Sequence, residues 1–400
     1  MTANYTPHPF ARTDRSLLAQ WWWTVDRGLL MAALALIGLG VALSFASSPA
    51  AIRADQSITD PFHYAWRMMV FASAGTAGML IASLLSPRGV RRIALLALVC
   101  AIVTMMALPF IGDHVKGASR WIDVGPFSLQ PSEFAKPALI VFAAWMFSEA
   151  QKGKGVPGVT IAFAIYAVIV GLLVIQPDIG QTLLITTTFM AVFFMAGVPF
   201  RWMLVLAGMV MSGLVATYFL FDHVRARVAK FVSPDQADTH QIDRASEDIA
   251  NGGLTGRGVG EGVMKKNVPD LHTDFIYSVA AEEFGLVLSL ILIALYAFIV
   301  LRGLRRAMKL NDSFEQTAAA GLFMLIGLQA VINVAVNLNL IPTKGMTLPF
   351  ISYGGSSMVA MGLTMGFALA LTRRRPGAYE PGSNLPRPRR TILKTKAAEE

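Results

Sequence analysis

Long apolar runs constrain this chain more than any other feature of its sequence. A helix that crosses a bilayer needs about 20 consecutive, mostly apolar residues. We expect such helices over 28–47, 68–85, 93–111, 132–149, 157–175, 179–197, 200–220, 275–300, 315–338 and 352–371. Only 15% of the 400 residues are charged, whereas soluble domains carry about 25%. The sequence therefore predicts an all-α polytopic membrane protein with about ten transmembrane helices.

The basic residues predict which loops face the cytoplasm. A net charge of +9 would suit a nucleic-acid binder, but Lys and Arg occur in short clusters between apolar runs, as in cytoplasmic loops. With the N-terminus inside, the cytoplasmic clusters are Arg12, Arg15 and Arg27; Arg88, Arg91 and Arg92; Lys152 and Lys154; Arg201; Arg302, Arg305, Arg306 and Lys309; and Arg373, Arg374 and Arg375. We predict an N-in, C-in topology and no nucleic-acid partner.

Two polar tails flank the apolar region. Residues 1–26 are expected to form a cytoplasmic tail without a cleavable signal peptide, because no apolar segment precedes Trp21. Residues 27–372 form one transmembrane domain, with a large external loop at 221–274. Residues 373–400 are rich in Pro, Arg and Lys, which predicts a disordered cytoplasmic tail; it is either simply solvated or docks a partner or lipid.

Ionisable residues interrupt the apolar pattern at two places. Glu133 and Lys136 lie in the first turns of the run 132–149 and share a helix face, because they are three residues apart. Ionisable groups cost about 3 kcal/mol each near the bilayer centre, and they tend to be paired and functional. This pair either orients helices or belongs to a site. Asp178 either caps the following helix, which its position favours, or reaches Lys136.

Two further motifs end external loops. Asp274, in the segment His272-Thr273-Asp274-Phe275, is either a helix N-cap or a carboxylate at the membrane surface, beside a loop large enough to cover a substrate. A Pro/Gly-rich segment, 340–357, leads into the last run. Its Gly354, Gly355 and Ser356 would present free N–H groups to a phosphate at a helix N-terminus, or would form a tight turn with capping serines.

The predicted topology places all of these motifs on the outer side. Transporters usually keep their polar residues near the midplane, so this arrangement favours an enzyme acting on a lipid-linked substrate outside the membrane, or an assembly surface there. Other sequence features do not indicate a nucleotide or metal site. Gly256–Gly262 is glycine-rich but does not match the dinucleotide-binding pattern GxGxxG. The six histidines lack metal-ligand spacing, and the single cysteine, Cys100, excludes a Cys-based metal site.

These motifs resemble the SEDS family (shape, elongation, division and sporulation) of bacterial cell-wall glycosyltransferases, over about 27–372. The resemblance rests on Gly117–Asp123, Gln130–Lys136, Gln176–Thr182, His272–Gly285 and Pro342–Ser357. The segment Pro342-Thr343-Lys344-Gly345, followed by Thr347-Leu348-Pro349, resembles the division branch rather than the elongation branch. The middle of the large loop, 233–252, matches the family pattern only loosely.

The resemblance implies ten transmembrane helices and a peptidoglycan glycosyltransferase that polymerises lipid II. It also implies a class B penicillin-binding protein of the FtsI type, the septal transpeptidase, together with other division proteins and membrane lipid as partners. The location would be the bacterial cytoplasmic (inner) membrane at the division septum. A lipid II flippase and a non-catalytic scaffold for the transpeptidase are the alternatives.

The resemblance also assigns roles to single residues. Asp274 falls on the family's essential aspartate, and we take it as the general base. Glu133, Lys136 and Asp178 fall on a supporting polar cluster. The candidates for contacts with the substrate or its pyrophosphate are Arg120, Lys344, Gly354, Gly355, Ser356, His272 and Thr273, with Lys136 as a further source of positive charge. No metal site and no cofactor is evident; a divalent cation is the one cofactor left open, although no carboxylate cage is visible.

Overall fold

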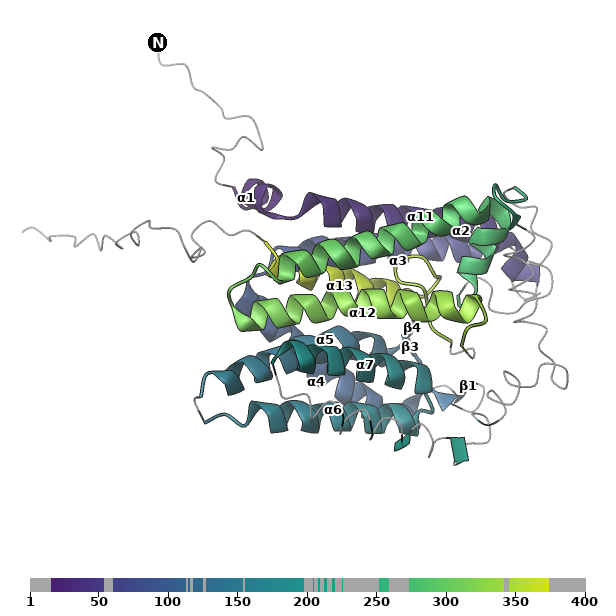
Figure 1. Cartoon of the computed structure of the whole chain (residues 1–400). Coiled ribbons are helices and arrows are strands. Elements are labelled where there is room, and N and C mark those ends of the chain that lie inside the picture. Colours follow the sequence, from purple (N-terminus) through teal and green to yellow (C-terminus); the bar gives the residue numbers. More distant parts are fainter. Residues whose placement is uncertain are drawn as a thin grey trace, which may run out of the picture.

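Helices make up most of the described chain and run side by side in one bundle (Figure 1). The computed structural model describes residues 16–53, 60–112, 114–115, 118–124, 127–153, 155–197, 252–258, 273–341 and 345–373, with single positions between 204 and 225. The helices are α1 Leu17–Thr24, α2 Arg27–Arg53, α3 His63–Ser83, α4 Pro87–Ile111, α5 Pro131–Gln151, α6 Gly158–Ile175, α7 Ile179–Met195, α11 Ile276–Ala307, α12 Ser313–Asn337 and α13 Gly355–Leu371.

The predicted spans coincide with these helices wherever the structure describes the chain. By length and composition, α2, α3, α4, α6, α11 and α12 can each cross a membrane, while α7 and α13 are apolar but shorter. The predicted span 200–220, most of the loop 221–274 and the tail beyond 373 lie outside the described residues. The all-α polytopic membrane fold is therefore confirmed, whereas the helix count and the orientation stay predictions.

Two features of the helices were not predicted from the sequence. The described part of the N-terminal tail, 1–26, contains the short helix α1, where the Ser16 hydroxyl caps the helix by accepting from the Ala19 N–H at 3.2 Å. The Trp21 indole donates to Ser83 Oγ at 2.8 Å, which fastens α1 to α3. The other feature is α11, which is longer than expected and is interrupted at Gly285.

Short strands replace the loop expected between α4 and α5. They are β1 His114–Val115, β2 Ala118–Ser119, β3 Ile122–Val124 and β4 Phe127–Leu129. β3 and β4 pair antiparallel, with Ile122 opposite Leu129, and they lie at the end of the bundle where α5 begins (Figure 1).

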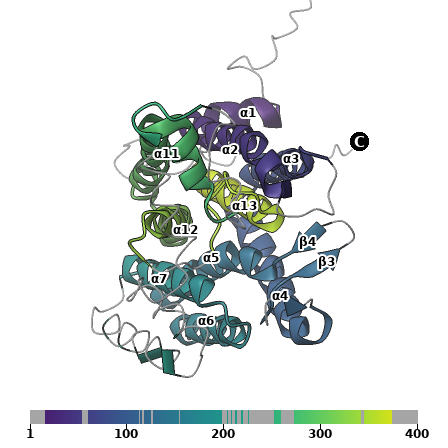
Figure 2. The ribbon, with the colours of Figure 1, turned by 90° about the vertical axis from the view of Figure 1, so that its right-hand side faces the viewer.

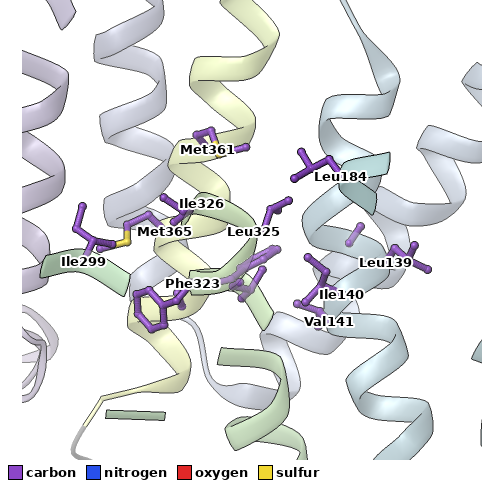
Figure 3. Close-up of a cluster of buried hydrophobic side chains, with 14 of the residues drawn as sticks. Leu139, Ile140, Val141, Leu184, Ile299, Phe323, Leu325, Ile326, Met361 and Met365 are labelled. Atoms are coloured by element: carbon purple, nitrogen blue, oxygen red, sulfur yellow. The ribbon is translucent and has the colours of Figure 1, made fainter. Parts of the chain in front are cut away.

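Helices α5, α12 and α13 occupy the middle of the bundle (Figure 2). Their inner faces meet in an apolar core with α7 and α11, where Phe323, Ile326 and Met365 are fully buried (Figure 3). Lipid tails are as apolar as these side chains, so helix association in a membrane depends on close packing and small residues. Gly362 of α13 accordingly meets the backbone of Gly75 in α3, with no room for a Cβ.

The two ends of the bundle differ in their charged residues. Arg302 and Arg306 lie near the end of α11 that faces α1, and they pair with the buried side chain of Asp26; the Arg302 Nε–Oδ1 distance is 3.0 Å. The opposite end carries β3, β4 and the start of α5 (Figure 1). The basic cluster of α11 and the start of α5 thus lie at opposite ends of the bundle.

Candidate functional site

A buried ion pair opens α5. Lys136 Nζ lies 2.9 Å from Glu133 Oε1 and 2.8 Å from Oε2, and the two residues are 1% and 2% exposed. Gln329 of α12 accepts a hydrogen bond from Lys136 Nζ at 2.9 Å, and Gln181 of α7 donates to Glu133 Oε1 at 2.7 Å. The predicted pair therefore forms, and it joins three helices. Buried charges are tolerated only with such partners.

Asp178 caps α7, as its sequence position favoured. Its Oδ1 accepts from the Gln181 N–H at 3.2 Å, and its Oδ2 lies 3.5 Å from Gln130 Nε2. Among the residues described around it, Asp178 bonds to these two amides rather than to Lys136. Burial raises the pKa of the Asp178 carboxyl, while the nearby charge of Arg120 and the hydrogen bond from Gln181 act in the opposite direction. Gln181 connects Asp178 to the ion pair.

Three amide side chains form a stripe along α12, which we call the amide stripe: Gln329, Asn333 and Asn337. They are four residues apart and so share one helix face, and they are at most 1% exposed. Gln329 Nε2 donates to the Thr347 carbonyl at 3.0 Å. This stripe was not predicted from the sequence, although the spacing of four between its three amides in an apolar run is a signal that could have indicated it.

Asp274 lies at the Asn337 end of the amide stripe. Its carbonyl accepts from Asn333 Nδ2 at 3.1 Å and from Asn337 Nδ2 at 3.0 Å. Asp274 is not the N-cap residue of α11, because Phe275 holds that position, and the Phe275 side chain makes no cap bond. Asp274 is instead partly exposed, and a Cβ placed on Gly345 would lie 3.5 Å from its Oδ2. The Asp274 carboxylate therefore lies beside the Pro/Gly-rich segment.

The segment 345–357 connects Asp274 to the ion pair. Asn333 Nδ2 also donates to the Met346 carbonyl at 2.6 Å, and the Thr347 and Ser357 hydroxyls lie 2.7 Å apart. Phe350 is buried with a φ of 65°, a conformation that non-glycine residues adopt rarely and that is concentrated at functional sites. The polar motifs thus form one continuous network.

The glycines and serine at the start of α13 serve packing. Gly354 is the N-cap without a side-chain cap bond, and a Cβ on Gly355 would meet the Phe71 ring. Ser356 Oγ accepts from the Gln130 N–H at 2.8 Å and donates to the Ser128 carbonyl at 3.0 Å. Ser356 therefore joins α13 to the β4–α5 connection instead of capping the helix.

The structure describes only some of the remaining residues that were predicted to contact the substrate. Arg120 donates to the carbonyls of Gln176 at 3.1 Å and Pro177 at 2.6 Å, so its guanidinium neutralises the carbonyl end of α6. Thr273 is partly exposed next to Asp274. His272 and Lys344 lie outside the described residues. Within the described ranges, no group of three or more His, Cys, Asp or Glu side chains could hold a metal ion.

Residues 252–258, which include the first described residues of the glycine-rich stretch Gly256–Gly262, support the break in α11. Gly285 has φ 73° and ψ −168°, and the groups freed there pair with residues 252–258. Arg257 N–H donates to the Glu282 carbonyl at 3.0 Å, and Leu286 N–H donates to the Gly253 carbonyl at 3.0 Å. A Cβ on Gly285 would overlap the backbone of this segment, so glycine is required at this close approach.

Sequence comparison places the chain among known proteins. Residues 27–376 match the FtsW/RodA/SpoVE family model, described as Cell cycle protein. A Caulobacter vibrioides protein named probable peptidoglycan glycosyltransferase FtsW is 66% identical over 379 residues, covering 95% of this chain and 97% of that protein. A Geobacter metallireducens protein of the same name is 36% identical, over 88% and 96% of the two chains.

Solved structures share the fold. One, described as "Structural coordination of polymerization and crosslinking by a peptidoglycan synthase complex", matches with a TM-score of 0.71 and 27% identity, covering 88% of this chain and 98% of that one. The rod shape determining protein RodA of Thermus thermophilus matches with a TM-score of 0.64 and 25% identity, over 88% and 97% of the chains.

Proposed function

The chain belongs to the FtsW/RodA/SpoVE family of cell cycle proteins, and we propose that it is a peptidoglycan glycosyltransferase that polymerises lipid II during septal wall synthesis. The observation that carries the proposal is the placement of Asp274. Its partly exposed carboxylate adjoins Gly345 at one end of the bundle, above a network that reaches the Lys136–Glu133 pair. The names of the relatives at 66% and 36% identity support the same activity.

The proposed reaction needs a base at the attacking hydroxyl. The 4-hydroxyl of a lipid II GlcNAc attacks the anomeric carbon of the strand's terminal MurNAc, forming the new glycosidic bond with inversion from α to β. The bond to undecaprenyl pyrophosphate breaks and the leaving group keeps its electron pair. The Asp274 carboxylate accepts the hydroxyl proton. A positioned general base contributes roughly 10²- to 10⁴-fold to the rate.

The departing pyrophosphate needs positive charge. Lys136 is committed to Glu133 and Gln329, and Arg120 to two backbone carbonyls, so we propose that both act by shaping the site. Lys344, which lies outside the described residues, adjoins Gly345 in the chain and is the proposed direct contact. A divalent cation is the one cofactor that this proposal admits.

The proposed setting is the division septum of the bacterial cytoplasmic membrane. The partner is a class B penicillin-binding protein of the FtsI type, with other division proteins and membrane lipid around it. Support comes from the related structure, which is described as a peptidoglycan synthase complex, and from the FtsW name of the relatives. The N-in, C-in topology would put Asp274 on the outer face, where lipid II is polymerised.

The test is polymerisation by purified protein. The chain is prepared with its class B partner, given lipid II, and the products are separated on a gel. Asp274→Asn is compared with wild type, and Asp123→Asn, an exposed carboxylate on β3, is the matched control. We expect long strands from wild type and the control, and at least a 100-fold loss in Asp274→Asn. Equal strands from all three would remove Asp274 from the chemistry; no strands from wild type would favour the flippase or the scaffold.

A further inference from the structure

Two amides of α12 converge on one carbonyl. The Nδ2 atoms of Asn333 and Asn337 lie 3.1 and 3.0 Å from the Asp274 oxygen, and a carbonyl oxygen has two lone pairs for such bonds. Asp274 precedes the N-cap Phe275, so its carbonyl lies outside the hydrogen-bond ladder of α11. The position of the Asp274 backbone is therefore set largely from α12.

Each of these asparagines also binds a second element of the site. Asn333 donates to the Met346 carbonyl at 2.6 Å, next to Gly345. Asn337 Oδ1 accepts from the Ser278 hydroxyl at 2.8 Å and from its N–H at 3.3 Å, in the first turn of α11. The same helix face thus fixes Asp274, the segment beside its carboxylate and the helix that follows.

The asparagines are tied to each other and are buried. Asn337 Nδ2 donates to the Asn333 carbonyl at 2.9 Å and lies 3.3 Å from its Oδ1, and neither side chain is more than 1% exposed. Burying an amide without hydrogen bonds is unfavourable. The bonds to Asp274 and Met346 offset that cost, which makes the arrangement stiff.

We propose that Asn333 and Asn337 are positioning residues, which hold the Asp274 carboxylate at the distance from Gly345 that the reaction needs. The inference rests on the proposed glycosyltransferase function and deepens it. A displacement of about 1 Å in a catalytic group can cost on the order of 10²-fold in rate. The asparagines act through Asp274 and do not themselves react.

The experiment measures kcat and KM for lipid II with Asn333→Ala, Asn337→Ala and the double variant, in the complex with the class B partner. Thr364→Val is the control, because it removes a buried hydroxyl that bonds only within α13, to the Ala360 carbonyl. We expect kcat to fall roughly 10- to 100-fold, with KM changed less than about twofold, and the control to match wild type. Rates are taken per folded molecule.

A second measurement separates positioning from mere stability. Each asparagine variant is combined with Asp274→Asn, whose residual rate needs no carboxylate placement. We expect no further loss of rate in that background. An equal loss with and without the Asp274 carboxylate would overturn the inference, as would asparagine variants as fast as wild type. If wild type itself made no strands, the proposed function would fail first, and this inference would fall with it.

Discussion

Removing the Lys136 ammonium alone should destabilise the protein strongly. Lys136→Met keeps most of the side-chain volume but removes the cation that lies 2.8 and 2.9 Å from the two Glu133 oxygens. The Glu133 carboxylate, 2% exposed, keeps Gln181 as a neutral partner at 2.7 Å. Breaking a buried pair in this way costs about 3–5 kcal/mol, which corresponds to roughly a 10²- to 10³-fold or larger shift of the unfolding equilibrium.

The double variant Glu133→Gln/Lys136→Met supplies the comparison. It removes both charges together, and replacement of a whole buried pair by well-packed hydrophobic groups of similar volume is often neutral or stabilising by about 1–4 kcal/mol. We therefore expect the double variant to be close to wild type and more stable than Lys136→Met. The assay is equilibrium unfolding of wild type, Glu133→Gln, Lys136→Met and the double variant in the same detergent, followed by circular dichroism and analysed as a double-mutant cycle.

Two results would refute this reasoning. One is a Lys136→Met protein as stable as wild type; the other is a double variant less stable than either single variant. Lipid II polymerisation by the stable double variant then tests whether the reaction needs the charged pair. Strands at the wild-type rate would make the pair structural, whereas a folded but inactive double variant would show that catalysis depends on its charges.

Other predictions follow from the glycines and the buried carboxylates. Gly285→Ala should lose at least about 1–3 kcal/mol of stability, since only glycine tolerates the φ and ψ of this position. Gly171 has open space around it, so Gly171→Ala should keep the wild-type stability. Thermal unfolding of both variants checks this prediction. Because burial raises the pKa of Asp178, its contribution to stability is greatest while it is protonated and is lost as the pH rises through that raised pKa. Asp178→Asn, which keeps a good N-cap and stays neutral, should be at least as stable as wild type at neutral pH with a flatter stability–pH curve, and a steeper curve would contradict this. Asp26→Ala should cost about 1–3 kcal/mol, because Arg302 loses a partner at 3.0 Å; equal unfolding midpoints would show that the pair is dispensable.

The helices were predictable because membrane insertion depends on local apolar content. Span 132–149 appears as α5 Pro131–Gln151, and 315–338 appears as α12 Ser313–Asn337. The break at Gly285 was not predictable, because a single glycine in an apolar run is compatible with a continuous helix. Its cause is a distant segment, 252–258, whose position no local pattern reveals.

The site was predictable where its partners lie close in sequence. Glu133 and Lys136 are three residues apart, and Asp178 caps the helix that begins at the next residue. The contact between Asn333 and Asp274 spans 59 residues, so it emerges only when α11 and α12 pack together. A hydropathy average also does not reveal such amides, because a few polar residues hardly lower the mean hydropathy of a long apolar run.

The break in α11 has a consequence for the order in which the protein assembles. In an unbroken helix, the Glu282 and Glu283 carbonyls would pair with the N–H groups of Leu286 and Val287; here all four groups pair with residues 252–258. Lipid offers no hydrogen bonds, so α11 cannot reach its final shape in the bilayer alone. The ribosome makes 252–258 before α11, so the segment that completes the helix already exists when α11 is synthesised.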